Sequence, residues 1–114
     1  MRHVLLIDLV DEAEAIVRYE AWHAAGALPP AIGASIRAAG IAAMEIYRTG
    51  NRLVMVMETD DAFDPDAKAA ADATNQAVQA WEARMDQVQR PLSWAGDDAK
   101  WTPARRIFSL AEQP

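Results

Sequence analysis

The chain has 114 residues, a net charge of −6 and no cysteine, and 52% of its residues are hydrophobic. This length and composition predict one domain, residues 1–114, with a packed core. The negative charge argues against nucleic acid and anionic membranes as partners, and the lack of cysteine excludes disulfides, thiolate catalysis and cysteine-based metal sites.

The first part of the chain predicts a strand followed by two helices. Val4–Leu9 is short, apolar and rich in branched side chains, as buried strands are. Asp11 is placed to cap a helix that runs to about Ala25, where Gly26 follows as a stop signal. Two prolines then break the chain, and Ala31–Ala39 predicts a second, short helix.

The middle of the chain predicts a hairpin and a long helix. The strands Ala42–Arg48 and Leu53–Thr59 flank a turn at Thr49-Gly50-Asn51, so we expect them to pair. An acidic connection then leads into a helix from about Pro65 to Val88.

The end of the chain completes the pattern. Arg90–Pro103 predicts an ordered loop whose tryptophans, Trp94 and Trp101, either line a pocket or anchor the loop, and Arg105–Leu110 predicts the last strand. The order is therefore β-α-β-β-α-β, the ferredoxin-like α+β arrangement. Helices cover only one face of such a sheet, so we expect a homodimer. Residues 54–57 alternate valine and methionine, which agrees with a strand that is buried on both faces.

The clearest functional signal is the pair Tyr19 and His23, four residues apart on the first predicted helix. Side chains at this spacing share one helix face, so a phenol and an imidazole would point into the same space. Imidazole transfers protons near neutral pH, and a pocket with this pair is suited to acid–base chemistry on a small hydroxylated molecule. The alternative is that both are ordinary residues at the edge of the core.

Metal and cofactor chemistry is not indicated. The second histidine, His3, lies far from His23, without the spacing of a transition-metal site, and there is no nucleotide or redox motif. We therefore expect no metal and no cofactor. The apolar segments are too short for a signal peptide or a membrane helix, so we expect a cytoplasmic protein.

Four stretches carry a further signal: Tyr19–His23, Met44–Leu53, Trp81-Glu82 and Arg106–Leu110. Over nearly its whole length the chain resembles the L-rhamnose mutarotase family. Met44–Leu53, with its continuation through Glu58, is most similar to the branch associated with L-fucose. The resemblance implies a cytoplasmic, cofactor-free enzyme that interconverts the anomers of a 6-deoxy-L-sugar and folds as a dimeric α+β barrel.

The resemblance also implies roles for single residues. His23 occupies the position of the family's proton donor, and Tyr19 that of a substrate-binding tyrosine. Trp81 matches the second tryptophan of a pair that contacts sugar in rhamnose-type members, while Ala80 stands in place of the first. Met44 stands where those members have a substrate-contacting tyrosine.

One segment departs from the family's pattern. Members usually carry Trp-Pro-Glu shortly after the histidine, whereas this chain has Gly26–Ala31, two residues longer and without that tryptophan and glutamate. The surroundings of His23, and with them the substrate, are therefore open to change.

We expect a mutarotase for L-fucose or L-rhamnose, with L-fucose favoured and a monosaccharide as the partner. His23 is the expected acid/base, Tyr19 a hydrogen-bonding partner and Trp81 a stacking surface for the C–H side of the sugar. The second proton-transfer group is open, with Glu45 and Glu58 as candidates. Two alternatives remain: a non-catalytic sugar-binding dimer, and a cofactor-free monooxygenase of the same dimeric-barrel fold.

Overall fold

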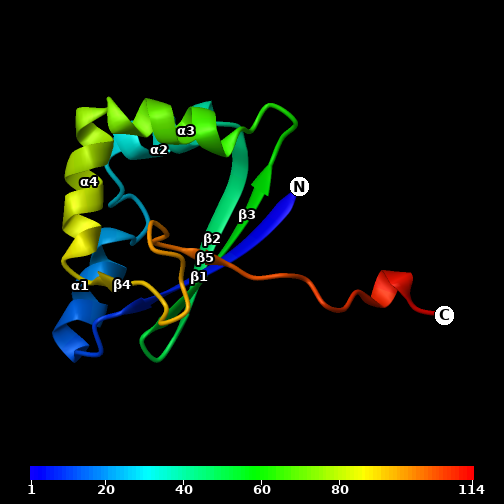
Figure 1. The fold of residues 1–114 in the computed structure, drawn as a ribbon. Helices are drawn as coiled ribbons and strands as arrows, with labels where there is room; N and C mark the ends of the chain where they lie inside the picture. The colour runs from blue at the N-terminus through cyan, green and yellow to red at the C-terminus, as the bar shows by residue number, and fades with distance from the viewer.

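The computed structural model describes residues 1–114 as an antiparallel sheet with helices on one of its faces (Figure 1), which confirms the predicted α+β class. The strands are β1 (Arg2–Leu9), β2 (Ile41–Thr49), β3 (Arg52–Thr59), β4 (Gln89–Arg90) and β5 (Thr102–Pro103). The helices are α1 (Ala13–Trp22), α2 (Pro30–Ala38), α3 (Pro65–Ala73), α4 (Gln76–Asp86) and the 3-10 turn η1 (Leu110–Glu112). None of them combines the length and the apolar character that crossing a membrane requires.

β1 lies in the middle of the sheet. It pairs with β3 from Arg2 opposite Glu58 to Asp8 opposite Arg52, and its other edge is shared by β4 and β5. β2 and β3 form the predicted hairpin. Their turn contains Gly50 at a φ of 57°, in the left-handed region where glycine is favoured because it has no Cβ.

The core forms where one end of the sheet meets α1 and α4. Alternate residues of a strand point to the same face, so the inward side chains of β1 and β3 pack against the apolar faces of these helices. The cluster consists of Ile7, Leu9, Ala15, Tyr19, Leu53, Met85 and Val88, each at most 3% exposed. Tyr19 therefore belongs to the core as well as being one of the site residues expected from the sequence.

α1 is shorter than the sequence predicts. It ends at Trp22 instead of about Ala25, and His23 is its C-cap residue, with φ −106° and ψ 4°. The cap at its start is Glu12, without a side-chain hydrogen bond, and not Asp11. Because the chain leaves the helix at His23, the imidazole lies at the helix end and is not part of a continuous helical stripe.

The predicted helix Pro65–Val88 is wrong as one element, because it divides into α3 and α4. The backbone of Asn75 is extended, and its side chain accepts hydrogen bonds from the N–H groups of Ala77 and Val78, which caps a new helix. The break turns the chain sharply, so that α3 and α4 run in clearly different directions on the helical side of the sheet (Figure 1).

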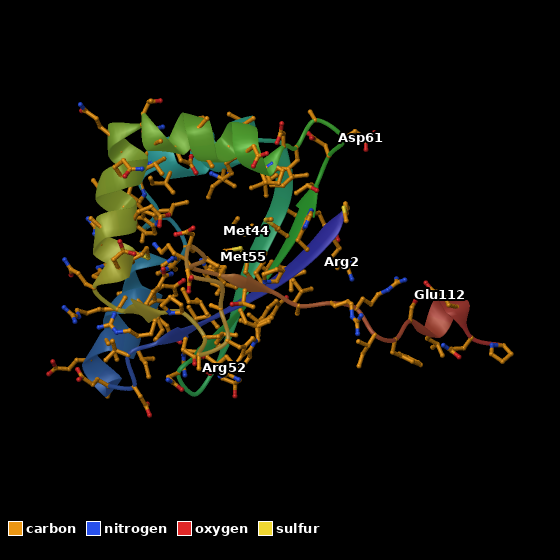
Figure 2. All side chains as sticks on the ribbon, in the orientation of Figure 1. Arg2, Met44, Arg52, Met55, Asp61 and Glu112 are labelled. Carbon is orange, nitrogen blue, oxygen red and sulfur yellow. The ribbon has the colours of Figure 1, made fainter.

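The predicted last strand Arg105–Leu110 is also wrong. Only Thr102 and Pro103 pair with β1, followed by one hydrogen bond from the Ala104 N–H to the carbonyl oxygen of Val4 at 2.8 Å. In this register Arg2, the first residue of β1, would already lie opposite residue 106, so β1 ends before a longer strand can form. The chain instead leaves the sheet as an extended tail that ends near Glu112 (Figure 2).

The face of the sheet opposite the helices carries an apolar patch, which we call the outer face. It consists of Val4, Leu6, Tyr47, Val54 and Val56, which the strand register places in adjoining rows. Ion pairs border this patch at both ends, between Arg2 and Glu58 at 2.7 Å and between Arg52 and Asp8 at 2.8 Å.

Candidate active site

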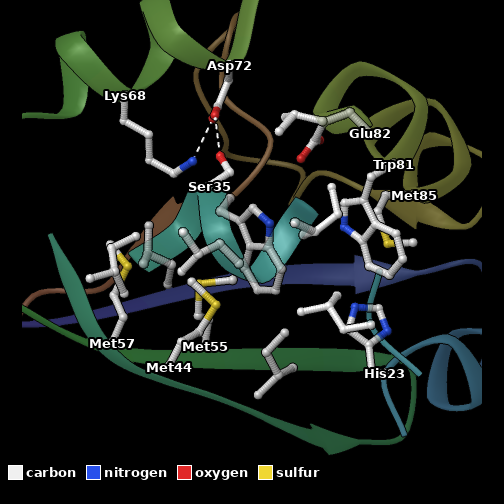
Figure 3. Close-up of a pocket in the computed structure, with 18 of the residues that line it drawn as sticks. His23, Ser35, Met44, Met55, Met57, Lys68, Asp72, Trp81, Glu82 and Met85 are labelled. Atoms are coloured by element: carbon white, nitrogen blue, oxygen red, sulfur yellow. Dashed lines mark hydrogen bonds and ion pairs between the residues drawn. The ribbon is translucent and has the colours of Figure 1, made fainter. Parts of the chain in front are cut away.

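A cavity of about 490 Å³ lies between the helices and the inner face of the sheet (Figure 3). Its floor is the inward row of three strands: Leu5, Met44, Ile46, Met55 and Met57. Helices and loops supply the remaining walls, which are also largely apolar. A small molecule would therefore meet a mostly apolar surface with a few polar groups, as in most ligand pockets.

His23 lies in the wall of this cavity between two aromatic rings. Its ring stacks on that of Tyr19 with the centroids 4.0 Å apart, and meets Trp81 edge-on at 5.3 Å. Its Nδ1 lies 2.7 Å from the backbone oxygen of Tyr19. A carbonyl oxygen only accepts, so Nδ1 carries the proton of the neutral ring and Nε2 is left as an acceptor.

Burial moves the pKa values of these two neighbours in opposite directions. Burial lowers the pKa of His23, and the hydrogen bond to the Tyr19 carbonyl only partly opposes this, so the neutral imidazole is favoured. Burial raises the pKa of Tyr19 to about 12; the charge of Glu82 adds to this, and Gln89 acts against it. A neutral base thus lies beside a protonated phenol, a division typical of acid–base sites.

Tryptophans form the aromatic part of the wall. Trp81 comes from α4 and contacts both His23 and the Arg84 guanidinium, which is 5.6 Å from its ring centroid. Trp101 lines the cavity from the late loop. Trp94 does not: it is 64% exposed and lies against the guanidinium of Arg52. Of the two loop tryptophans, Trp101 therefore lines the pocket and Trp94 does not.

The two carboxylates that the sequence suggested as second proton-transfer groups do not line the cavity. Glu58 is ion-paired with Arg2, and Glu45 is exposed on the same side of the sheet, because both have the outward parity of their strands. The carboxylates that do line it are Glu82 and Asp72. The sequence offered one clue to Glu82, which directly follows Trp81, and no clue to Asp72.

Lys100 fixes the side chain of Glu82. Its ammonium group contacts the Glu82 carboxylate and lies 2.8 Å from that of Asp86, one turn further along α4. These two ion pairs hold the late loop, with Trp101 next to Lys100, against α4. No three His, Cys, Asp or Glu side chains gather closely enough to hold a metal ion.

The segment that departs from the family's pattern supplies apolar groups to the site. After α1 the chain turns at Gly26, with φ 80°, and Leu28 then lines the cavity, followed by Ile32 just beyond the segment, in α2. Met44, the fourth residue singled out from the sequence, lies on the floor beside Met55 (Figure 3). The structure thus brings Tyr19, His23, Met44 and Trp81 to one cavity.

Fold and cavity together define the class: a ferredoxin-like α+β protein with a small-molecule site between its sheet and its helices. The model of the L-rhamnose mutarotase family matches residues 2–110, and the chain belongs to this family. It is therefore a carbohydrate isomerase of the mutarotase type, which confirms the predicted family and enzyme class.

Individual relatives agree with this assignment. An L-fucose mutarotase from Xanthomonas campestris pv. campestris is 46% identical over 107 residues, which are 94% of this chain and 86% of that protein. Among solved structures, an L-rhamnose mutarotase from Formosa agariphila has a TM-score of 0.64 at 14% identity, covering 96% of this chain and 98% of that one. Tetracenomycin F2 cyclase from Streptomyces glaucescens follows with 0.60 at 18% identity, covering 96% and 95%. At such low identity these two structures confirm only the ferredoxin-like α+β barrel fold.

Proposed function

We propose that this mutarotase interconverts the anomers of L-fucose, with His23 and Tyr19 as its proton-transfer groups. The observation that carries the proposal is the contact, in one cavity wall, of a neutral imidazole with a phenol that keeps its proton. The name of the relative from Xanthomonas supports L-fucose as the first sugar to test. L-rhamnose, which the family description names, is the second.

The proposed reaction opens and closes the sugar ring. Nε2 of His23 takes the proton of the anomeric hydroxyl while the bond between C1 and the ring oxygen breaks. The ring oxygen keeps the electron pair and takes a proton from the Tyr19 hydroxyl, and C1 becomes an aldehyde carbon. Rotation about the C1–C2 bond followed by the reverse steps returns both protons and yields the other anomer. A positioned acid–base group of this kind contributes about 10²–10⁴-fold.

The remaining walls suit a 6-deoxysugar. The face of Trp81 offers a surface for the C–H side of the ring, and its edge contact with His23 places that surface beside the proposed base. The sulfur-containing floor of Met44 and Met55 offers an apolar, adaptable contact for the C6 methyl group, where a hydroxymethyl group would lose hydrogen bonds.

We also propose that two copies pair through the outer face. Tyr47 on this face is 54% exposed, and the tail presents Ile107 at 86% and Phe108 at 65% exposure. Exposed apolar side chains gathered in this way are typical of protein interfaces. The sheet of the second copy would cover the outer face, and the tail of each copy would pack against the surface of the other. For the location of the protein, the cytoplasm remains our proposal from the sequence.

The test is saturation-transfer NMR of anomer exchange with L-fucose and L-rhamnose. Wild type is compared with His23→Asn and with the control His3→Asn, which replaces the other histidine, bonded to Thr59 outside the cavity wall. We expect acceleration that His23→Asn lowers by about 10²-fold or more and His3→Asn leaves unchanged. Acceleration of neither sugar would contradict the proposed function. Full activity of a folded His23→Asn variant would contradict the role of His23.

A further inference from the structure

One polar cluster in the cavity has no part in the proton transfers. It consists of Lys68 and Asp72 on α3 and Ser35 on α2, all of which line the cavity. The Lys68 ammonium lies 2.7 Å from Asp72 Oδ2, and the Ser35 hydroxyl donates to Asp72 Oδ1 at 3.2 Å. We call these three residues the α3 cluster.

Hydrogen bonds within the α3 cluster use only part of the donors and acceptors of its side chains. An ammonium group has three N–H donors, of which Asp72 uses one, and each carboxylate oxygen can accept a further hydrogen bond. The side chains of Lys68 and Asp72 are 24% and 25% exposed, so much of their remaining capacity is turned away from bulk water. Since the pair is neutral overall, it suits a neutral polyol better than a phosphate or a sugar acid.

The cluster also lies away from the proposed catalytic pair. Figure 3 shows Lys68, Asp72 and Ser35 on one side of the cavity and His23 with Trp81 on the other, with Met44 and Met55 below the α3 cluster. In a pyranose ring, C4 lies across the ring from C1. A sugar with its C1 at His23 therefore directs its C4 hydroxyl toward the side on which the α3 cluster lies.

We propose that the α3 cluster binds the C4 hydroxyl of the sugar and selects its configuration. This inference rests on the proposed function, because it takes the anomeric carbon to be at His23. L-fucose and L-rhamnose differ in configuration at C2 and at C4, so a group that recognises C4 separates them without touching the reacting atoms. Lys68 and the Asp72 carboxylate would be donor and acceptor to one hydroxyl, which fixes its direction.

Four 6-deoxy-L-sugars allow recognition at C4 to be measured separately from recognition at C2. L-fucose and L-quinovose differ only at C4, as do L-rhamnose and 6-deoxy-L-talose, whereas L-fucose and 6-deoxy-L-talose differ only at C2. We would measure kcat/KM for all four with wild type, Asp72→Asn, Lys68→Met and the milder Ser35→Ala. The control is Asp66→Asn, an exposed carboxylate on the same helix that does not line the cavity.

We expect Asp72→Asn and Lys68→Met to reduce the preference between C4 epimers about ten- to a hundredfold, mainly through KM, because a charge-assisted hydrogen bond is lost. The preference between the C2 epimers should stay, and Asp66→Asn should resemble wild type. Unchanged C4 preference in variants that unfold at the wild-type temperature would overturn the inference. Wild type without activity on any of the four sugars would instead overturn the proposed function, and this inference with it.

Discussion

The pH dependence of anomer exchange follows from the state of His23. Its Nδ1 proton is engaged by the Tyr19 carbonyl at 2.7 Å, so only Nε2 can accept the sugar proton, and it does so only in the neutral ring. Burial lowers the pKa of His23 from 6.5. For any pKa at or below this value, the neutral fraction is at least about one half at pH 6.5 and at least about nine tenths at pH 7.5.

Enzymatic exchange should therefore be flat from pH 7.5 to 9 and fall at lower pH, reaching a tenfold loss per unit below the pKa of His23. Tyr19, with a pKa of about 12, keeps its proton throughout and adds no loss at the alkaline end. The assay is saturation-transfer NMR from pH 5 to 9, with the uncatalysed exchange subtracted at every point. His3→Asn is the control, because it removes the other histidine and should leave the profile unchanged. If exchange became slower as the pH rises from 6.5 to 8, the imidazolium would be the active form. This result would refute the assignment of neutral His23 as the base.

Unfolding has to be separated from this loss of activity, because the same group makes stability depend on pH. A histidine whose pKa is lowered in the folded state binds fewer protons there than in the unfolded chain. Its contribution is complete above the unfolded pKa of 6.5 and is lost as the pH falls through the folded pKa, at no more than about 1.4 kcal/mol per pH unit. Thermal unfolding in the same buffers shows where the protein is still folded.

Three further predictions concern single parts of the molecule. Tyr19→Phe keeps the ring that stacks on His23 but removes its hydroxyl, so exchange should fall by about 10²-fold; an active, folded variant would exclude the phenol as proton donor. Trp81→Leu should raise KM for the sugar about tenfold through loss of the ring surface, while the matched change at exposed Trp94 leaves KM unchanged, and equal effects would contradict the placement of the sugar. Deletion of residues 105–114 should shift the protein from dimer toward monomer in sedimentation velocity, and an unchanged dimer would show that the tail is not part of the interface.

Local patterns in the sequence were sufficient for much of the fold. The hairpin followed from two apolar strands around Gly50. The spacing of four residues predicted the contact between Tyr19 and His23, although His23 lies at the end of the helix and not within it. In both cases the partners are close in the chain, so the geometry of one element or one turn determines the contact.

The parts that sequence reasoning missed depend on contacts between distant segments of the chain, or on a single capping residue within a stretch that otherwise favours a helix. The prediction of the last strand was wrong because the length of that strand depends on the register at which residues 102–103 pair with β1. The alanine-rich helix formers around Asn75 favour one continuous helix, and a single capping side chain overrides them. The α3 cluster joins Ser35 to Asp72 across 37 positions, which no spacing rule relates.

The break at which Asn75 caps α4 lies between two helices that have different proposed roles. α3 carries the cluster proposed to recognise the sugar, and α4 carries the tryptophan beside the proposed base. A capping interaction contributes only about 1 kcal/mol, so a substitution at residue 75 could tilt one helix against the other at little cost in stability. Evolution of a new sugar preference could therefore begin at a position that never contacts the sugar, and a selection for altered specificity should be allowed to sample it.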